Sequence, residues 1–382
     1  MRKKSITKLF FVLLTLGCLS CDSLTSRLNS ITDETEEESL GPSQDMNVLL
    51  EISVPVGEDV KRTTEKTINV LKSRLNSVGI ARPNIQKTDT AGRIRIEMKG
   101  VKEPERILKL IESPGVLEFW ETAETGELIP QIVAVNDMAK EMEEQSPAQE
   151  EKPKAKVEPK AEEKPIAQTA MDSIFEKLKE SEEDSNSFQE VDFEEYKKSN
   201  PLFAILLIDT RLQSRSPVIG MAEGKDTAKI SEYFRIAKEK NLFPSFIYPT
   251  WTSKIESRVE KGSYYFELIA LASNSGNGKA ALNGDVITKA EAERGYQYKD
   301  YCINLEMDLK GAEAWARLTK KNVDKTIAIV FDGHVYSYPR VNQEITGGRS
   351  QITGNFTKKE AKDLATILMS GQLPAHVKII QK

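Results

Sequence analysis

Hydrophobic and polar residues alternate along residues 46–125 with the periods of short strands and amphipathic helices. Leu71, Leu75 and Val78 recur three and four positions apart, as on one face of a helix, and RIRIEM alternates strictly, as in a half-buried strand. The expected order is strand, helix, strand, strand, helix and strand, over 47–54, 63–78, 84–88, 93–98, 103–111 and 116–120. This order predicts an α+β fold with a ferredoxin-like antiparallel sheet and helices on one face.

The last part of the chain, residues 284–382, shows the pattern of a further α+β subdomain. We expect its strands and helices over 303–307, 309–322, 326–331, 335–338, 357–370 and 377–380. Asp332-Gly333 lies between two of these strands and predicts a tight hairpin turn. Thr357 and Glu360 have the spacing of a helical capping box, and Gly371 suits the left-handed residue that ends such a helix.

The middle of the chain changes character twice. Residues 137–198 are rich in Lys, Glu, Pro and Ala without an apolar period. Such a stretch cannot bury enough apolar surface to offset its ordering entropy, so we expect a low-complexity disordered insert. Residues 201–283 are expected to be an inserted α+β segment, with strands over 202–208 and 264–272 and a helix over 226–240.

The N-terminus has the pattern of a secretory signal over residues 1–21: basic residues, an apolar run and then small residues and cysteines. The run is shorter than the roughly 20 residues that span a bilayer. Cys21 suits the lipidated cysteine of a bacterial lipoprotein, with Cys18 as the second candidate and an ordinary cleaved signal as the alternative. We expect a lipid anchor in the inner or outer membrane, facing the periplasm, and a flexible tether over 22–45.

Composition narrows the possible functions. The chain has 382 residues, more than one compact core usually uses, and a net charge of −5. This balance gives no concentrated basic face for nucleic acid. With two histidines and three cysteines, a metal site or a histidine-dependent triad has few residues to be built from. We therefore expect no enzyme, no cofactor and no metal site.

Two stretches contain specific motifs. Residues 328–374 read AIVFDGHVYSYPRVNQEITGGRSQITGNFTKKEAKDLATILMSGQLP, and residues 67–121 include RLNSVGI, GRIRIEMKGV and LEFWE. Together they resemble the first periplasmic domain, P1, of SecD, a protein translocase subunit, with the elements D-G, V-Y-S-x-P, I-T-G-G and G-x-L-P in the family's order. The charged insert and the LEFW phrase are similar to the fused SecDF form of Bacteroidetes.

The resemblance implies a role in Sec-dependent protein translocation. Its implied partners are unfolded or emerging secretory polypeptides and the membrane components of the translocon, SecYEG and a SecF-like protein. The sequence departs from the family at GPSQDM (41–46), where a G-L-D-L-x-G-G motif is expected, and it reaches Lys382 without the family's membrane helices. We therefore expect an accessory factor that binds exported polypeptides on the periplasmic side without its own proton-driven motor. A scaffolding lipoprotein that keeps the P1 fold is the alternative.

Three residues are candidates for contact with such a polypeptide. Tyr336 and Tyr338 are expected on one side of an edge strand before Pro339, where an extended peptide can pair main chain to main chain. A buried aromatic pair is the alternative. Arg349, within the Gly-rich segment 345–356, can reach the carbonyls of a bound chain, while the glycines favour a bulged hairpin over a phosphate cradle.

Other chemical groups of the sequence favour structural roles. Glu118 and Glu121 flank a tryptophan on an expected strand, and we interpret both as solvated. His334 and His376 are expected at the surface. Cys302, next to a strand, is expected to be a small buried hydrophobic residue.

Overall fold

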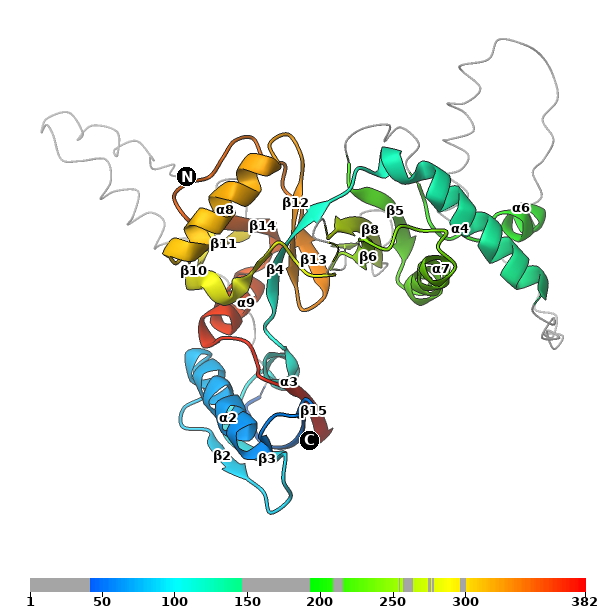
Figure 1. Cartoon of the computed structure of the whole chain (residues 1–382). Coiled ribbons are helices and arrows are strands. Elements are labelled where there is room, and N and C mark those ends of the chain that lie inside the picture. The colour runs from blue at the N-terminus through cyan, green and yellow to red at the C-terminus, as the bar shows by residue number, and fades with distance from the viewer. Residues whose placement is uncertain are drawn as a thin grey trace, which may run out of the picture.

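A computed structural model describes residues 42–145, 193–208, 216–253, 255–256, 264–273, 276, 278–295 and 300–382. Figure 1 shows three parts: a ferredoxin-like unit drawn in blue with a red strand, a central unit in cyan, yellow and orange, and a side lobe in green. The predicted signal over 1–21 and its lipidation site Cys21 lie outside the described residues, as do most of the predicted tether and insert.

The ferredoxin-like unit is an antiparallel sheet with the strand order β15-β1-β3-β2 and two helices. Its elements are β1 (Gln44–Ser53), α2 (Val60–Ser77), β2 (Asn84–Lys87), β3 (Arg93–Val101), α3 (Pro104–Glu112) and β15 (His376–Gln381). Helix α2 begins where the Asp59 carboxylate accepts a hydrogen bond from the Arg62 amide at 2.7 Å, and it ends before Gly79, which has a φ of +85°. The fold class and the elements predicted over 47–111 are confirmed.

The fourth strand of this sheet comes from the far end of the chain. The strand predicted over 116–120 exists as β4 (Leu117–Thr122), but it pairs with a strand of a different sheet, and β15 takes the place expected for it beside β1. β4 is buried on both faces, since Phe119 packs into one core cluster and Trp120 into another. Such a strand suits a sheet covered on both faces, whereas β15 buries Val377 and exposes His376 and Lys378, as in a sheet with one solvated face.

The central unit contains most of an eight-stranded sheet in which β4 lies between β12 and β8. The strand order is β13-β12-β4-β8-β5, with β6 and β7 paired to β8 and β9 paired to β4. The bounds are β5 (Val218–Glu223), β6 (Ile247–Trp251), β7 (Ile255–Glu256), β8 (Tyr264–Ala272), β9 (Leu282–Asn283), β12 (Ile327–Phe331) and β13 (His334–Ser337). Asp332 and Gly333 both have positive φ, +47° and +80°, which confirms the tight hairpin turn.

A second, three-stranded sheet in the central unit has the order β10-β11-β14 and packs against helix α9. Its bounds, with the helices and the short 3-10 turn η1, are η1 (Gly284–Val286), β10 (Ile287–Arg294), β11 (Tyr301–Met307), α8 (Leu309–Lys321), β14 (Arg349–Phe356) and α9 (Lys358–Ser370). The capping box of Thr357 and Glu360 is present at the start of α9, and Gly371 ends the helix with a φ of +84°. Cys302 is buried, as expected.

The side lobe consists of α4 (Thr125–Gln145), α6 (Phe193–Ser199) and α7 (Thr227–Glu239), which pack with β5, β6 and β8 around their own core. Helix α4 corrects the expectation of disorder from residue 137, because Met138 and Ala139 continue the buried stripe of Leu128, Ile132 and Val135. At the other end of the predicted insert, residues 193–199 form α6.

The strand predicted over 202–208 is wrong. Leu202 and Leu206 are both buried, but they lie four positions apart on a helical turn, in which the Leu206 amide donates to the Leu202 carbonyl at 2.8 Å. The strand of this region is β5, which sequence patterning did not identify. Within the described ranges, no helix is both long and apolar enough to span a bilayer.

Candidate functional site

Two short segments connect the ferredoxin-like unit with the central unit: residues 113–116, between α3 and β4, and residues 371–375, between α9 and β15. The fully buried side chain of Arg74, on α2, contacts both crossovers. Its Nη1 donates to the carbonyls of Leu110 at 3.0 Å and Ser113 at 2.5 Å. Its Nη2 donates to the carbonyls of Pro114 at 3.4 Å and Gly371 at 3.0 Å. One guanidinium group therefore holds both chain segments on which the orientation of the two units depends.

The carboxylate of Asp332 holds the first crossover from the opposite side. It accepts hydrogen bonds from the amides of Gly115 and Val116, each at 2.8 Å, and a short one from the Ser113 hydroxyl. Burial lowers the pKa of Arg74 to about 10, and the charge of Asp332 partly opposes this shift. The guanidinium nevertheless stays protonated at neutral pH.

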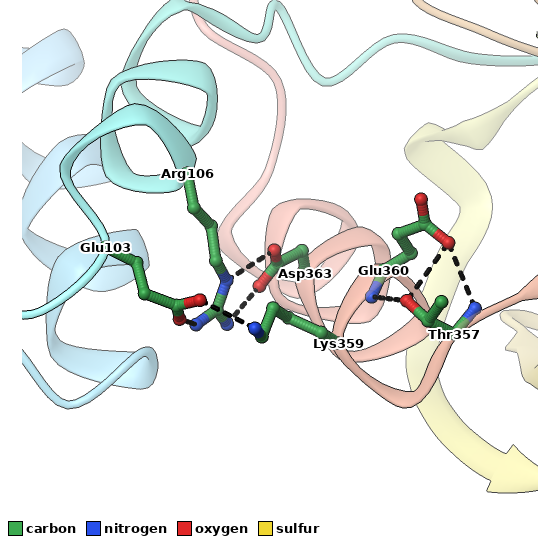
Figure 2. Close-up of polar contacts among 6 residues, drawn as sticks. All are labelled: Glu103, Arg106, Thr357, Lys359, Glu360 and Asp363. Carbon is green, nitrogen blue, oxygen red and sulfur yellow. Dashed lines mark hydrogen bonds and ion pairs between the residues drawn. The ribbon is translucent and has the colours of Figure 1, made fainter. Parts of the chain in front are cut away.

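Helices α3 and α9 add an ionic contact between the two units, shown in Figure 2. The Arg106 guanidinium binds both carboxylate oxygens of Asp363, at 2.7 and 2.5 Å, and one of Glu103 at 2.7 Å. The Lys359 ammonium binds the other Glu103 oxygen at 2.6 Å. Hydrogen bonding to Lys359 holds the pKa of Glu103 below its usual value, and the bond to Asp363 raises that of Arg106. We call the contacts of Arg74, Asp332 and these four residues the junction.

Another face of α9 lines a groove of about 570 Å³ beside strand β10. The lining residues come from the end of α2, from β10 and from α9: Ser77, Ala290, Glu291, Ala292, Glu293, Lys362, Ala365, Thr366 and Met369. The groove is shallow and open to solvent, unlike the clefts that enclose small ligands. Met369 is 52% exposed, and three of the lining residues are alanines, so much of the groove wall is backbone and flexible side chain.

The structure separates the predicted contact residues Tyr336, Tyr338 and Arg349. The pairing of β12 with β13 has a register irregularity beside Tyr336. Tyr336 packs against the large core and stacks on Phe356, with ring centroids 5.9 Å apart. Tyr338 packs against the separate cluster that contains Trp120. The two tyrosines therefore do not share one side of the strand, contrary to expectation. Arg349 is exposed on β14, 3.8 Å from the Glu306 carboxylate.

The expected peptide edge of β13 is partly occupied. The Val335 carbonyl accepts a hydrogen bond from the Ser253 amide at 2.9 Å, and the Tyr338 hydroxyl donates to Glu267 at 2.7 Å. Polypeptide contact by Tyr336, Tyr338 and Arg349 stays a prediction, and this geometry leaves less room for it than the groove beside β10 does.

The interpretation of Glu121 as solvated is wrong. Its side chain is buried, and its carboxylate accepts hydrogen bonds from the Asn322 amide and the Lys321 ammonium, because β4 is a central strand. His334 and His376 are exposed, as expected. Among the described residues, no cluster of His, Cys, Asp and Glu is suited to hold a metal ion.

The junction was not identified from the sequence, although part of its signal is present. Arg74 follows Leu71 by three positions and so falls on the apolar face of its helix, where a charge needs buried partners. Asp332 was interpreted as a turn residue alone. The partners of both residues lie far along the chain, which no local pattern reveals.

Comparison with known proteins connects this geometry to a family. Residues 64–124 match the family model for the N-terminal part of the P1 domain of protein translocase subunit SecDF, and residues 271–375 match that for the SecDF P1 head subdomain. The SecD subunit of Rhodothermus marinus is 30% identical over 334 residues, which cover 87% of this chain and 48% of that protein. The SecD subunit of Syntrophobacter fumaroxidans is 42% identical over 106 residues, 28% of this chain and 20% of that protein.

Among solved structures, SecDF in its super-membrane-facing form matches with 21% identity and a TM-score of 0.46, over 94% of this chain and 33% of that one. The chain thus spans about half the length of its Rhodothermus marinus relative and a smaller share of the others cited. Both matching family models describe parts of the P1 domain of SecDF. This chain is a P1-domain protein of the SecD and SecDF family.

Proposed function

We propose that this chain serves Sec-dependent protein export by binding exported polypeptides on the periplasmic side of the membrane. Membership of the P1 family supports the link to translocation. The observation that carries the binding role is the groove beside β10, which lies mostly within the residues matched to the head subdomain and is lined by small and flexible side chains. A surface of this kind accepts many sequences, as a factor for diverse exported chains must.

The test compares an unfolded chain with its folded form. The full-length protein is purified in detergent, and its binding to a fluorescently labelled, slowly folding secretory precursor is followed by anisotropy after dilution of the precursor from denaturant. We expect saturable binding of the unfolded precursor and none of the folded one. Equal binding of both forms, or of neither, would contradict the proposal.

The membrane anchor and the translocon partners are part of the same proposal. Incorporation of labelled palmitate in cells, lost in a Cys21→Ser variant, is the expected sign of a lipid anchor. Co-purification with SecYEG and a SecF-like protein is expected from a translocation factor. Co-purification with the translocon, combined with no binding of any unfolded precursor, would favour the scaffolding role instead.

A further inference from the structure

Strand β10 is one edge of the three-stranded sheet, and its outward main-chain groups face the groove along α9. β10 pairs with β11 alone among the described strands. The amide of Ala290 points away from β11, since it donates to the Met369 sulfur at 3.1 Å. In an antiparallel pair, residues with inward and outward main-chain groups alternate, so the amide and carbonyl of Ala292 also point outward.

This edge is only partly protected, because helix α9 packs beside β10 but contributes only the Met369 sulfur to the Ala290 amide. A thioether is a weak hydrogen-bond acceptor, so the Ala290 amide loses little binding energy when it exchanges the Met369 sulfur for another acceptor. Natural edge strands are usually blocked by proline, by inward charges or by a covering element. Here helix α9 packs beside β10 and the exposed side of the strand is charged, but Ile287–Arg294 contains no proline, and the groove-lining side chains of Ala290 and Ala292 are small.

The charges around the groove also restrict the ligand. Lys362 on α9 is positive, whereas Glu291 and Glu293 on β10 are negative, so the rim favours neither a strongly acidic nor a strongly basic partner. Outward main-chain donors and acceptors, small walls and an exposed methionine together suit an extended chain that is recognised through its backbone.

We propose that an exported polypeptide binds this groove as an added strand, antiparallel or parallel to β10, through the main-chain groups of Ala290 and Ala292. The proposal rests on the polypeptide-binding function proposed above and assigns its site. Met369 then leaves the Ala290 amide and covers the apolar side chains of the bound segment. Main-chain pairing gives affinity without a required sequence, while the groove gives a modest preference for small apolar residues.

The experiment uses the full-length protein and a short fluorescein-labelled peptide of alternating valine and threonine with lysine at both ends. Two twin peptides, N-methylated at the odd or at the even amides, keep the side chains, and each loses the hydrogen bonds of one edge. We expect one of the twins to bind the wild-type protein at least about tenfold more weakly than the unmethylated peptide, the effect of roughly one main-chain hydrogen bond. Equal affinity for the unmethylated peptide and both twins would refute strand addition.

An Ala292→Pro variant tests the site itself. Proline removes an outward amide that takes no part in pairing with β11, a position at which edge strands accept proline. The matched control is Gln351→Pro on β14, the opposite edge of the same sheet, where the residue paired with Asn304 also has outward main-chain groups. Circular dichroism and thermal unfolding check that both variants are folded.

We expect Ala292→Pro to weaken peptide binding at least tenfold and Gln351→Pro to leave it unchanged. If both variants bind the unfolded precursor and the peptide as the wild type does, the function proposed above stands and this site is wrong. If the wild type binds neither probe, the proposed function fails first. A concentration-dependent dimer that Ala292→Pro abolishes would assign the edge to a second copy of this chain and overturn the proposal.

Discussion

The buried guanidinium of Arg74 gives the sharpest test of the junction. An Arg74→Met variant keeps the side-chain stem and removes the hydrogen bonds to helix α3 and to both crossovers. Three of these bonds are 3.0 Å or shorter, to the carbonyls of Leu110, Ser113 and Gly371. At ~2 kcal/mol for each bond from a charged donor, they contribute ~6 kcal/mol. The buried Nε, which has no hydrogen-bond partner, and the burial of the charge, which lowers the pKa to about 10, offset part of this gain. The variant is therefore expected to lose roughly half of the sum, ~3 kcal/mol of unfolding free energy.

The assay is urea unfolding followed by tryptophan fluorescence and far-ultraviolet circular dichroism. Arg62→Met is the matched control, because Arg62 is exposed on the same helix and its replacement is expected to change stability by less than about 0.5 kcal/mol. An Arg74→Lys variant keeps the charge but not the forked donors, so an intermediate loss is expected. If Arg74→Met unfolds at the same urea concentration as Arg62→Met, the guanidinium does not hold the crossovers and the reasoning fails.

Three further changes test neighbouring contacts. Gly115→Ala is expected to cost at least ~2 kcal/mol in urea unfolding, because Gly115 has a φ of +80° and an added Cβ would lie 2.5 Å from the Arg74 guanidinium; a neutral result would contradict it. Glu103→Gln is expected to be less stable than the wild type above pH ~4.5, and the difference should vanish as the pH falls through the lowered pKa of Glu103; a difference that grows in acid would show the wrong sign. Tyr338→Phe is expected to lose ~1 kcal/mol with its bond to Glu267 while peptide binding stays unchanged, and a binding loss without a stability loss would restore Tyr338 as a contact residue.

Local signals in the sequence correctly predicted the elements whose causes are local. The capping box at Thr357, the glycine that ends α9 and the turn at Asp332-Gly333 each depend on residues a few positions apart, and all three are present. The strict alternation of 93–98 likewise gave β3. Helix α4 was missed as a whole: no helix is predicted over 125–136, and disorder is predicted from 137, although the buried stripe of the helix continues to Ala139.

Partners distant along the chain could not be derived in the same way. β4 and β15 are both short apolar strands, and a single sequence does not show which of them pairs with β1. The hydrogen bonds of Arg74 and the α3–α9 ion pairs join residues from opposite ends of the described chain. The groove beside β10 forms only where an edge strand packs beside a helix, so no local sequence motif predicts it.

The origin of β15 at the far end of the chain has a consequence for the order in which the molecule is completed. β1 pairs with β15 from Ser53↔His376 onward, so one side of β1 lacks its native partner until β15 has been synthesised. The ferredoxin-like unit therefore cannot complete its sheet before the central unit and the side lobe have been synthesised. Pairing across such a separation is slow, and the open strand is meanwhile available to other chains. A factor proposed to bind unfolded polypeptides thus itself exposes an unpaired strand edge until β15 has been synthesised.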